Sequence, residues 1–196
     1  MQSYVHAHQA AYNVLAASIV AWIAIEMVRG SRQSEKADEQ DNRLSTVFLR
    51  SSVIGGIVLG FFTSHIESLT IAFSPFWFYV FGLSMIWIGI AYRWYAVRYL
   101  GKYFSFDLET QEDHEVVDTG PYNIVRNPSY TGALISAVGI GLALDNYLSL
   151  VLVTIGSIVG YAYRIRVEEE VLLENLGEDY EDYMEETPYR LIPYVW

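Results

Sequence analysis

Long apolar stretches with almost no charged side chains alternate with short polar segments along the chain. Residues 10–28 carry a single charge, Glu26, and residues 74–92 carry none. A helix that crosses a bilayer needs about 20 mostly apolar residues. The pattern predicts five membrane-spanning helices, over residues 10–28, 50–71, 75–95, 128–144 and 147–163.

The last two predicted spans form a helical hairpin, because only Asp145 and Asn146, a turn-forming pair, separate them. The alternative is a water-soluble bundle of five buried helices. Residues 76–92 argue against it, since they are apolar on every face, whereas a soluble helix keeps a polar stripe. We therefore predict an all-α integral membrane protein that forms one membrane domain over residues 1–196.

The basic residues predict an orientation in the membrane. With five spans, all 12 Lys and Arg residues fall on the side of the C-terminus. Positively charged loops stay in the cytoplasm, so we expect the N-terminus outside, and the C-terminal helical segment, with any active site that it carries, on the cytoplasmic side. Residues 1–95 would supply three anchoring spans. Residues 96–196 would supply the loops, the hairpin and the C-terminal helix in which chemistry could lie.

Composition supports the membrane prediction and removes several functions. Of the 196 residues, 53% are hydrophobic and 18% are charged, whereas about 25% charged residues are usual in a soluble domain. The chain contains no cysteine, which excludes a thiol nucleophile and a thiolate zinc site. The formal net charge of −11 disfavours nucleic acid as a partner, because phosphates must be neutralised by Lys and Arg.

The start of the fourth predicted span carries the first candidate chemistry. Asn127 suits a helix N-cap, and Pro128 suits the first helical position. The free N–H groups of such a helix start attract anions, and Arg126 adds a full positive charge beside them. One interpretation is a corner that binds a carboxylate. The other is a capped helix whose arginine reaches toward the lipid head groups.

Arg164 and Glu168 form the second candidate, because residues four apart on a helix share a face and can pair. They lie where the fifth predicted span leaves the membrane, at a depth where charges tend to be paired and functional. An exposed acidic helix is the alternative interpretation of this segment. His114 is the only histidine beyond residue 95. A single histidine is a poor metal site, so we predict no metal.

Five sequence blocks follow one another in an order typical of one family. They are His114 with Gly120-Pro121-Tyr122, Arg126-Asn127-Pro128-Ser129-Tyr130-Thr131-Gly132, Arg164 followed by Glu168-Glu169, Gly177 followed by Tyr180 and Tyr183, and Leu191 followed by Pro193. From about residue 100 to residue 193 the chain thereby resembles the isoprenylcysteine carboxyl methyltransferases. These are integral membrane enzymes that use S-adenosylmethionine and are related to phospholipid N-methyltransferases. The histidine usual in the family is Asn127 here, which can donate a hydrogen bond but cannot titrate near pH 7.

The resemblance implies methyl transfer from S-adenosylmethionine to the carboxylate of a lipid-like acceptor, such as a prenylcysteine, that arrives from the bilayer. A carboxylate is already ionised at neutral pH, so this reaction needs no general base. The resemblance implies catalytic roles for Arg126 and Arg164, which would hold the carboxylate, and for Glu168, which would orient them. The implied cofactor-binding residues are His114, Gly120, Tyr122, Asn127, Pro128, Tyr130 and Glu169.

Two other functions remain open on the sequence. One is N-methylation of an amine phospholipid or a small amine, which would need a base or a shifted pKa to free the nitrogen lone pair. The other is a non-enzymatic membrane scaffold or carrier. Carriers usually place charges at the middle of the membrane, whereas the predicted spans hold almost none.

Overall fold

The computed structural model describes residues 3–34, 40–71, 74–101 and 116–196. Within these ranges the chain is helical and contains no strand, as predicted. The elements are α1 (Tyr4–Ala7), α2 (Gln9–Ser34), α3 (Gln40–Thr63), η1 (Glu67–Leu69), α4 (Pro75–Leu100), η3 (Gly120–Asn123), α5 (Pro128–Ala143), α6 (Tyr147–Leu176) and α7 (Glu178–Glu186).

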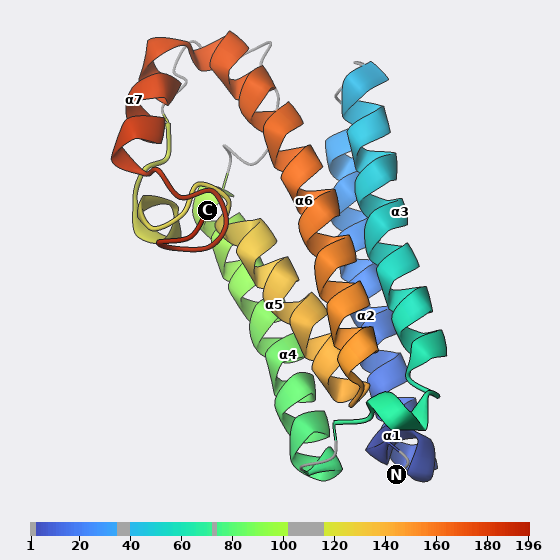
Figure 1. Ribbon diagram of the computed structural model, residues 1–196. Helices are drawn as coiled ribbons and strands as arrows, with labels where there is room; N and C mark the ends of the chain where they lie inside the picture. Colours follow the sequence, from blue (N-terminus) through green and yellow to red (C-terminus); the bar gives the residue numbers. More distant parts are fainter. Residues whose placement is uncertain (1–2, 35–39, 72–73, 102–115) are drawn as a thin grey trace.

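The five long helices, α2 to α6, lie side by side and run alternately in opposite directions (Figure 1). The N-terminus, α1 and the turn between α5 and α6 lie at one end of this bundle, here called the N-terminal end. The C-terminus and α7 lie at the other, the C-terminal end. The chain therefore passes along the bundle five times, and its two termini lie at opposite ends.

Four of the five helices are long and apolar enough to cross a membrane. The fifth, α5, has 16 residues and is about 24 Å long, which is shorter than the hydrocarbon core of about 30 Å. The helix limits differ from the predicted ones: α6 continues past residue 163 to Leu176, whereas α3 begins earlier than predicted, at Gln40, and ends earlier, at Thr63. The predicted limits followed the loss of apolar character, whereas a helix continues through polar residues as long as its backbone bonds are made.

Small residues let α4 and α5 approach closely. A Cβ atom added at Gly132 of α5 would lie 2.7 Å from the carbonyl oxygen of Gly89 of α4, and one added at Gly89 would overlap Ser136. The Ser136 hydroxyl also donates to the carbonyl of Ile86 at 3.0 Å. Close approach at small residues is the usual packing of helices in a membrane, where burial from water does not hold helices together.

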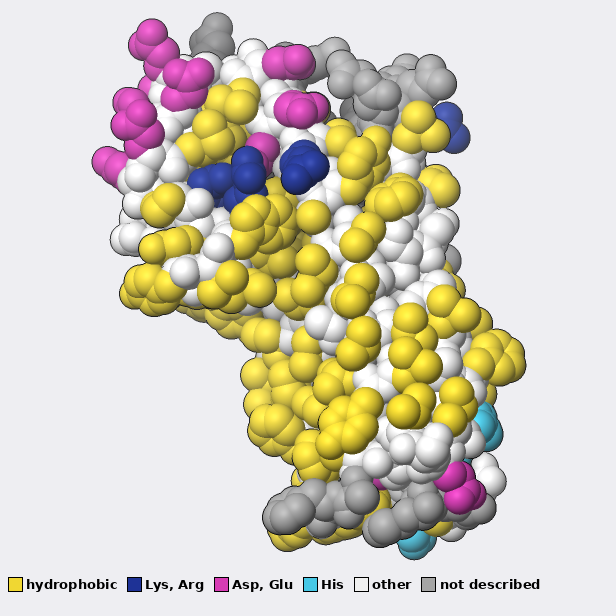
Figure 2. Space-filling model, in the orientation of Figure 1, with side chains coloured by type: hydrophobic (Ala, Val, Ile, Leu, Met, Phe, Trp, Pro, Cys, Tyr) yellow, Lys and Arg dark blue, Asp and Glu magenta, His cyan; other side chains and the backbone are white. Residues whose placement is uncertain are grey.

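On the face shown in Figure 2, hydrophobic side chains are spread along most of the length of the bundle. Phe62, Trp77 and Ile88 are at least 60% exposed. So much exposed apolar surface suits lipid rather than water. Together with the four long apolar helices, it identifies a multi-pass membrane protein.

The predicted turn at Asp145 and Asn146 is confirmed. Asp145 has a φ of 53°, in the left-handed region that Asp tolerates better than most residues. The Asn146 side chain caps α6 by accepting from the backbone N–H groups of Leu148 and Ser149 at 3.0 and 3.1 Å. It also donates to the Ile66 carbonyl at 3.1 Å, which fixes the segment before α4 to the hairpin.

Candidate active site

Two consecutive glutamates of α6 each bind one of the predicted arginines near the C-terminal end of the bundle. Nε of Arg164 donates to Oε1 of Glu168 at 2.8 Å, which confirms the predicted pairing four residues apart. Nε of Arg126 donates to Oε1 of Glu169 at 2.9 Å. Both arginines are buried. The two candidate arginines thus meet the same turn of α6, although Arg126 precedes the hairpin in sequence.

Glu169 receives a second arginine on its other oxygen. Nε of Arg190 donates to Oε2 at 2.7 Å. Arg126 also donates from Nη1 to the backbone carbonyl of Thr187 at 2.8 Å. The Glu169 carboxylate, which is nine-tenths or more buried, therefore joins three parts of the chain: the segment before α5, α6 and the C-terminal segment.

The C-terminal segment runs beside the start of α5. The backbone N–H of Arg126 donates to the Tyr189 carbonyl at 2.9 Å, and that of Asn127 donates to the Arg190 carbonyl at 2.9 Å. The Thr131 hydroxyl donates to the Leu191 carbonyl at 2.7 Å. These bonds bring the second and fifth sequence blocks together, so the C-terminal segment is fixed against the start of α5.

Tyr130 connects α5 to the Arg164–Glu168 pair. Its hydroxyl donates to Oε1 of Glu168 at 2.8 Å, the same oxygen that accepts from Arg164. Its ring lies against that of Tyr161, with 5.3 Å between the centroids. Both rings are buried, so the Tyr130 hydroxyl holds the Glu168 carboxylate in a site that water reaches poorly.

Arg164 also reaches α3, where Nη1 donates to the Ser45 hydroxyl at 2.7 Å. Ser45 is fully buried. Sequence reasoning missed Ser45, because a serine in an apolar helix carries no signal of its own. It missed Arg190 as well, although a basic residue directly before the Leu191 block was a usable hint.

Gly120 and Tyr122, from the first sequence block, pack against α4 and α7. Burial raises the pKa of Tyr122 and of Tyr183 above the usual tyrosine value, so both hydroxyls stay protonated and act as donors. Tyr183 donates to the Tyr122 carbonyl at 2.8 Å, and Tyr122 donates to the Ala96 carbonyl at 3.3 Å. Gly120 has a φ of 60°, and a Cβ there would overlap the ring of Tyr99.

Asn127 and Pro128 begin α5 as predicted, with Pro128 at the first helical position. The Asn127 side chain makes no cap bond, which differs from the expectation for an N-cap residue. Its amide nitrogen is buried and has no hydrogen-bond partner among the residues that the structure describes. Buried donors are normally satisfied, so this nitrogen suits an acceptor atom of a bound molecule.

His114 lies outside the described residues. Among residues 3–34, 40–71, 74–101 and 116–196, no three His, Asp or Glu side chains are placed to hold a metal ion together.

Comparison with known proteins supports the resemblance seen in the sequence. A family model described as phospholipid methyltransferase matches residues 77–179. Protein-S-isoprenylcysteine O-methyltransferase B of Arabidopsis thaliana is 34% identical over 121 residues, which are 61% of this chain and 61% of that protein. Protein-S-isoprenylcysteine O-methyltransferase of Saccharomyces cerevisiae is 37% identical over 106 residues, 53% of this chain and 44% of that protein.

A solved structure of the eukaryotic intramembrane Ras methyltransferase ICMT (isoprenylcysteine carboxyl methyltransferase) has the same fold. It matches with a TM-score of 0.54 and 25% identity, over 82% of this chain and 55% of that chain. The chain thus spans about three-fifths or less of the length of these relatives. The predicted resemblance is confirmed.

Proposed function

The chain belongs to the phospholipid methyltransferase family, and from that premise we propose that it transfers a methyl group from S-adenosylmethionine to a lipid-like carboxylate. A prenylcysteine is the acceptor that the named relatives suggest. The observation that carries the proposal is a buried cluster at the C-terminal end of the bundle. It gathers Arg126, Tyr130, Arg164, Glu168 and Glu169 from three of the sequence blocks.

One observation supports a fit between the chain's residues and the cofactor. The buried amide nitrogen of Asn127 has no hydrogen-bond partner among the described residues. In this proposal it donates to an oxygen of the cofactor. Gly120, Tyr122, Pro128, Tyr130 and Glu169 would form the surrounding wall, with His114 from outside the described residues. When bound, S-adenosylmethionine supplies a methyl group on a positively charged sulfur, which a carboxylate oxygen can accept without a general base.

Arg164 is the residue that we assign to the acceptor carboxylate. Its bond to Glu168 fixes the plane of the guanidinium, and its bond to Ser45 ends on a neutral hydroxyl. A carboxylate accepts from an arginine more strongly than a hydroxyl does, so an incoming carboxylate can take the place of Ser45. Arg126 binds Glu169 and the Thr187 carbonyl, so its part in the proposal is to hold the C-terminal segment over the site.

We also propose that the chain crosses the membrane five times, with the N-terminus outside and the site facing the cytoplasm. The C-terminal end holds the arginines, whereas the segments at the N-terminal end contain no Lys or Arg. The short helix α5 is mostly buried between its neighbours, so it need not match the bilayer. Its start then lies below the head groups, where an acceptor with a lipid tail can reach Arg164 sideways.

Methylation of an amine lipid is the second candidate, and the description of the matching family favours it. Two buried arginines beside the site disfavour a cationic acceptor. Asn127, which stands where the family usually has a histidine, cannot titrate near pH 7.

Two measurements on purified protein in detergent test the proposal. Calorimetry should detect binding of S-adenosylhomocysteine, and no heat at about millimolar ligand, where even weak sites fill, would refute a cofactor site. Arg164→Ala should lower kcat by about a hundredfold or more, as expected when a charged partner of the transition state is lost. Affinity for S-adenosylhomocysteine should change little. Arg166→Ala, on an exposed position of the same helix, is the matched control.

A further inference from the structure

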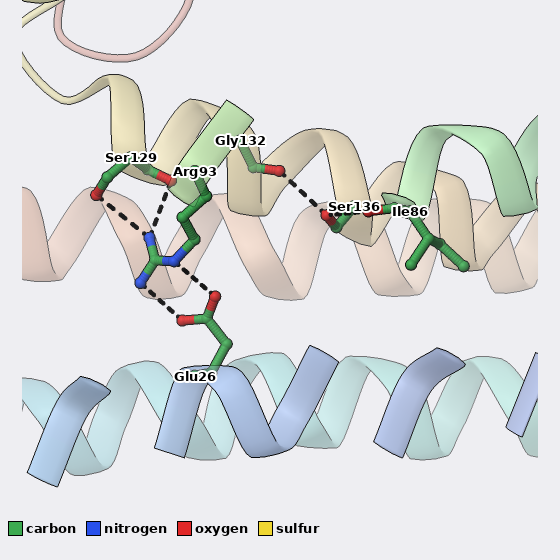
Figure 3. A network of polar contacts seen from close by, with 6 residues as sticks. All are labelled: Glu26, Ile86, Arg93, Ser129, Gly132 and Ser136. Carbon is green, nitrogen blue, oxygen red and sulfur yellow. Dashed lines mark hydrogen bonds and ion pairs between the residues drawn. The ribbon is translucent and has the colours of Figure 1, made fainter. Parts of the chain in front are cut away.

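A further, partly buried ion pair lies outside all five sequence blocks, between α2 and α4 (Figure 3). Nε of Arg93 lies 2.7 Å from Oε1 of Glu26, and Nη2 donates to Oε2 at 2.8 Å. One edge of the guanidinium, formed by Nε and Nη2, thus faces both oxygens of the Glu26 carboxylate, a geometry that fixes the orientation of the arginine. Glu26 is the single charge of the first predicted span.

The remaining edge of Arg93 contacts the first turn of α5. Nη1 donates to the Ser129 carbonyl at 2.9 Å and to the Ser129 hydroxyl at 3.3 Å. The guanidinium carbon lies 5.5 Å from the centre of the Tyr130 ring, within range of a cation–π interaction. Arg93 therefore holds the turn that carries Tyr130, and Figure 3 shows it reaching from α4 between Glu26 and Ser129.

Stability alone does not account for this pair. Removing two charges from water costs about as much as their attraction returns, and apolar side chains of similar size often stabilise a core better. Charges inside membrane helices are rare and usually serve a site. Through Tyr130 the pair is connected to the site, since the Tyr130 hydroxyl binds the Glu168 oxygen that also accepts from Arg164.

We propose that Arg93, oriented by Glu26, is a positioning residue that sets Tyr130 and thereby the Glu168–Arg164 pair. The inference rests on the proposed methyl transfer, and it extends the site to α2 and α4. None of the five sequence blocks lies in the first predicted span, and the proposal gives this span a role in the geometry of the reaction. In this proposal Glu26 orients the Arg93 guanidinium, and Arg93 in turn holds the first turn of α5. That turn carries Tyr130, whose hydroxyl binds the Glu168 carboxylate that orients Arg164.

The test separates a positioning role from a simple structural tie. The double variant Glu26→Arg with Arg93→Glu re-forms an ion pair between α2 and α4, but it removes the cation beside Tyr130 and Ser129. Relative to the single variant Glu26→Gln, it should recover the midpoint of thermal unfolding in detergent. Its kcat should stay at least about tenfold below that of the unmodified protein, as expected for a lost charge-assisted hydrogen bond.

Arg93→Lys is the milder variant, in case the double variant fails to fold. Lysine keeps a positive charge next to Glu26. Its single ammonium group cannot bind both the Glu26 carboxylate and Ser129 in the way that the planar guanidinium does. We expect a nearly unchanged unfolding midpoint, a kcat reduced by about tenfold, and a smaller change in KM for the acceptor. Arg98→Lys is the matched control, because Arg98 lies on the exposed side of the same helix against Trp94.

Hydrogen–deuterium exchange without ligands gives a readout that needs no activity. Amides of residues 127–134 should exchange faster in both Arg93 variants than in the unmodified protein. The inference is overturned if Arg93→Lys, or a folded double variant, shows the kcat and the exchange of the unmodified protein. If the unmodified protein neither binds S-adenosylhomocysteine nor transfers a methyl group, the proposed function fails, and the exchange data alone decide the link between Arg93 and α5.

Discussion

Arg126 and Glu169 are 43 residues apart in sequence, and their side chains form a buried ion pair of 2.9 Å. Arg126 precedes the hairpin of α5 and α6, and Glu169 lies near the end of α6. The hairpin therefore brings the chain back to the end of the bundle at which α5 begins. The ion pair of Arg126 and Glu169 joins the two ends of the hairpin there. Arg190 binds the free oxygen of the same carboxylate, so the C-terminal segment is fastened at the same point.

Glu169→Gln tests this closure. The amide cannot satisfy two arginines as the carboxylate does, and breaking a buried pair typically costs about 3 kcal/mol or more of stability. We expect a lower unfolding midpoint and a loss of affinity for S-adenosylhomocysteine of about tenfold or more. Glu170→Gln, at the exposed neighbouring position, should change neither. Unchanged affinity in Glu169→Gln would mean that the C-terminal segment does not shape a cofactor site.

Gly89→Ala tests the packing of α4 against α5. The added methyl group would overlap Ser136 and the Gly132 carbonyl, so the helices must separate. Overpacking of this kind costs about 1–3 kcal/mol. We expect a clear drop in the midpoint of thermal unfolding in detergent. Gly55→Ala is the control, because a Cβ there would meet no atom within 4 Å. Equal stability of the two variants would contradict the observed contact.

Asn127→His tests the position at which the chain departs from its family. If Asn127 only donates a hydrogen bond to the cofactor, a histidine can replace it. We then expect kcat for a carboxylate acceptor to stay within about threefold of the unmodified value, far less than the loss of a catalytic group. A large gain in methylation of an amine acceptor would instead favour the second candidate function.

Asp145→Asn tests a buried carboxylate far from the site. Asp145 is fully buried, and neither carboxylate oxygen has a well-placed partner among the described residues. Burial raises the pKa of Asp145 to about 6, only partly offset by the Tyr4 backbone N–H. The native state therefore favours the protonated form. Its free energy of unfolding should fall as the pH rises from about 4 to about 6, by up to about 3 kcal/mol.

The variant Asp145→Asn lacks this titration and tolerates the same backbone conformation, since Asn also adopts positive φ. It should unfold at a higher temperature than the unmodified protein at about pH 8, and the difference should shrink toward about pH 4. Thermal unfolding in detergent across this range measures both. A difference that does not depend on pH would show that the carboxylate of Asp145 titrates normally.

The sequence predicted which segments form long helices better than it predicted the residues at which those helices begin and end. Hydropathy detects residues 128–144 as an apolar segment, and the residue types of Asp145 and Asn146 indicate the turn that follows it. Both signals are local in the sequence. It could not set the start of α3 at Gln40 or the end of α6 at Leu176, because helices continue beyond the bilayer. Helix α5, the fourth predicted span, shows another limit of hydropathy, since it has only 16 residues and most of them are buried within the bundle.

The site was predicted only where residues are close in sequence or follow the family pattern. The pair of Arg164 and Glu168 follows from helix geometry alone. The partners Ser45, Arg190 and Arg93 come from distant segments, and their contacts depend on how the helices pack. Glu26 was visible as a lone charge in an apolar span, which was the one local signal for its ion pair with Arg93.

The central claim is that the chain methylates a carboxylate. The most direct measurement incubates the purified protein with S-adenosylmethionine labelled in its methyl group, with a prenylcysteine analogue in one sample and an amine lipid in another. Treatment with base then separates the products, because a methyl ester releases labelled methanol and an N-methyl group does not. Our account predicts base-labile label with the prenylcysteine analogue, lost in Arg164→Ala. Base-stable label on the amine lipid alone would contradict it.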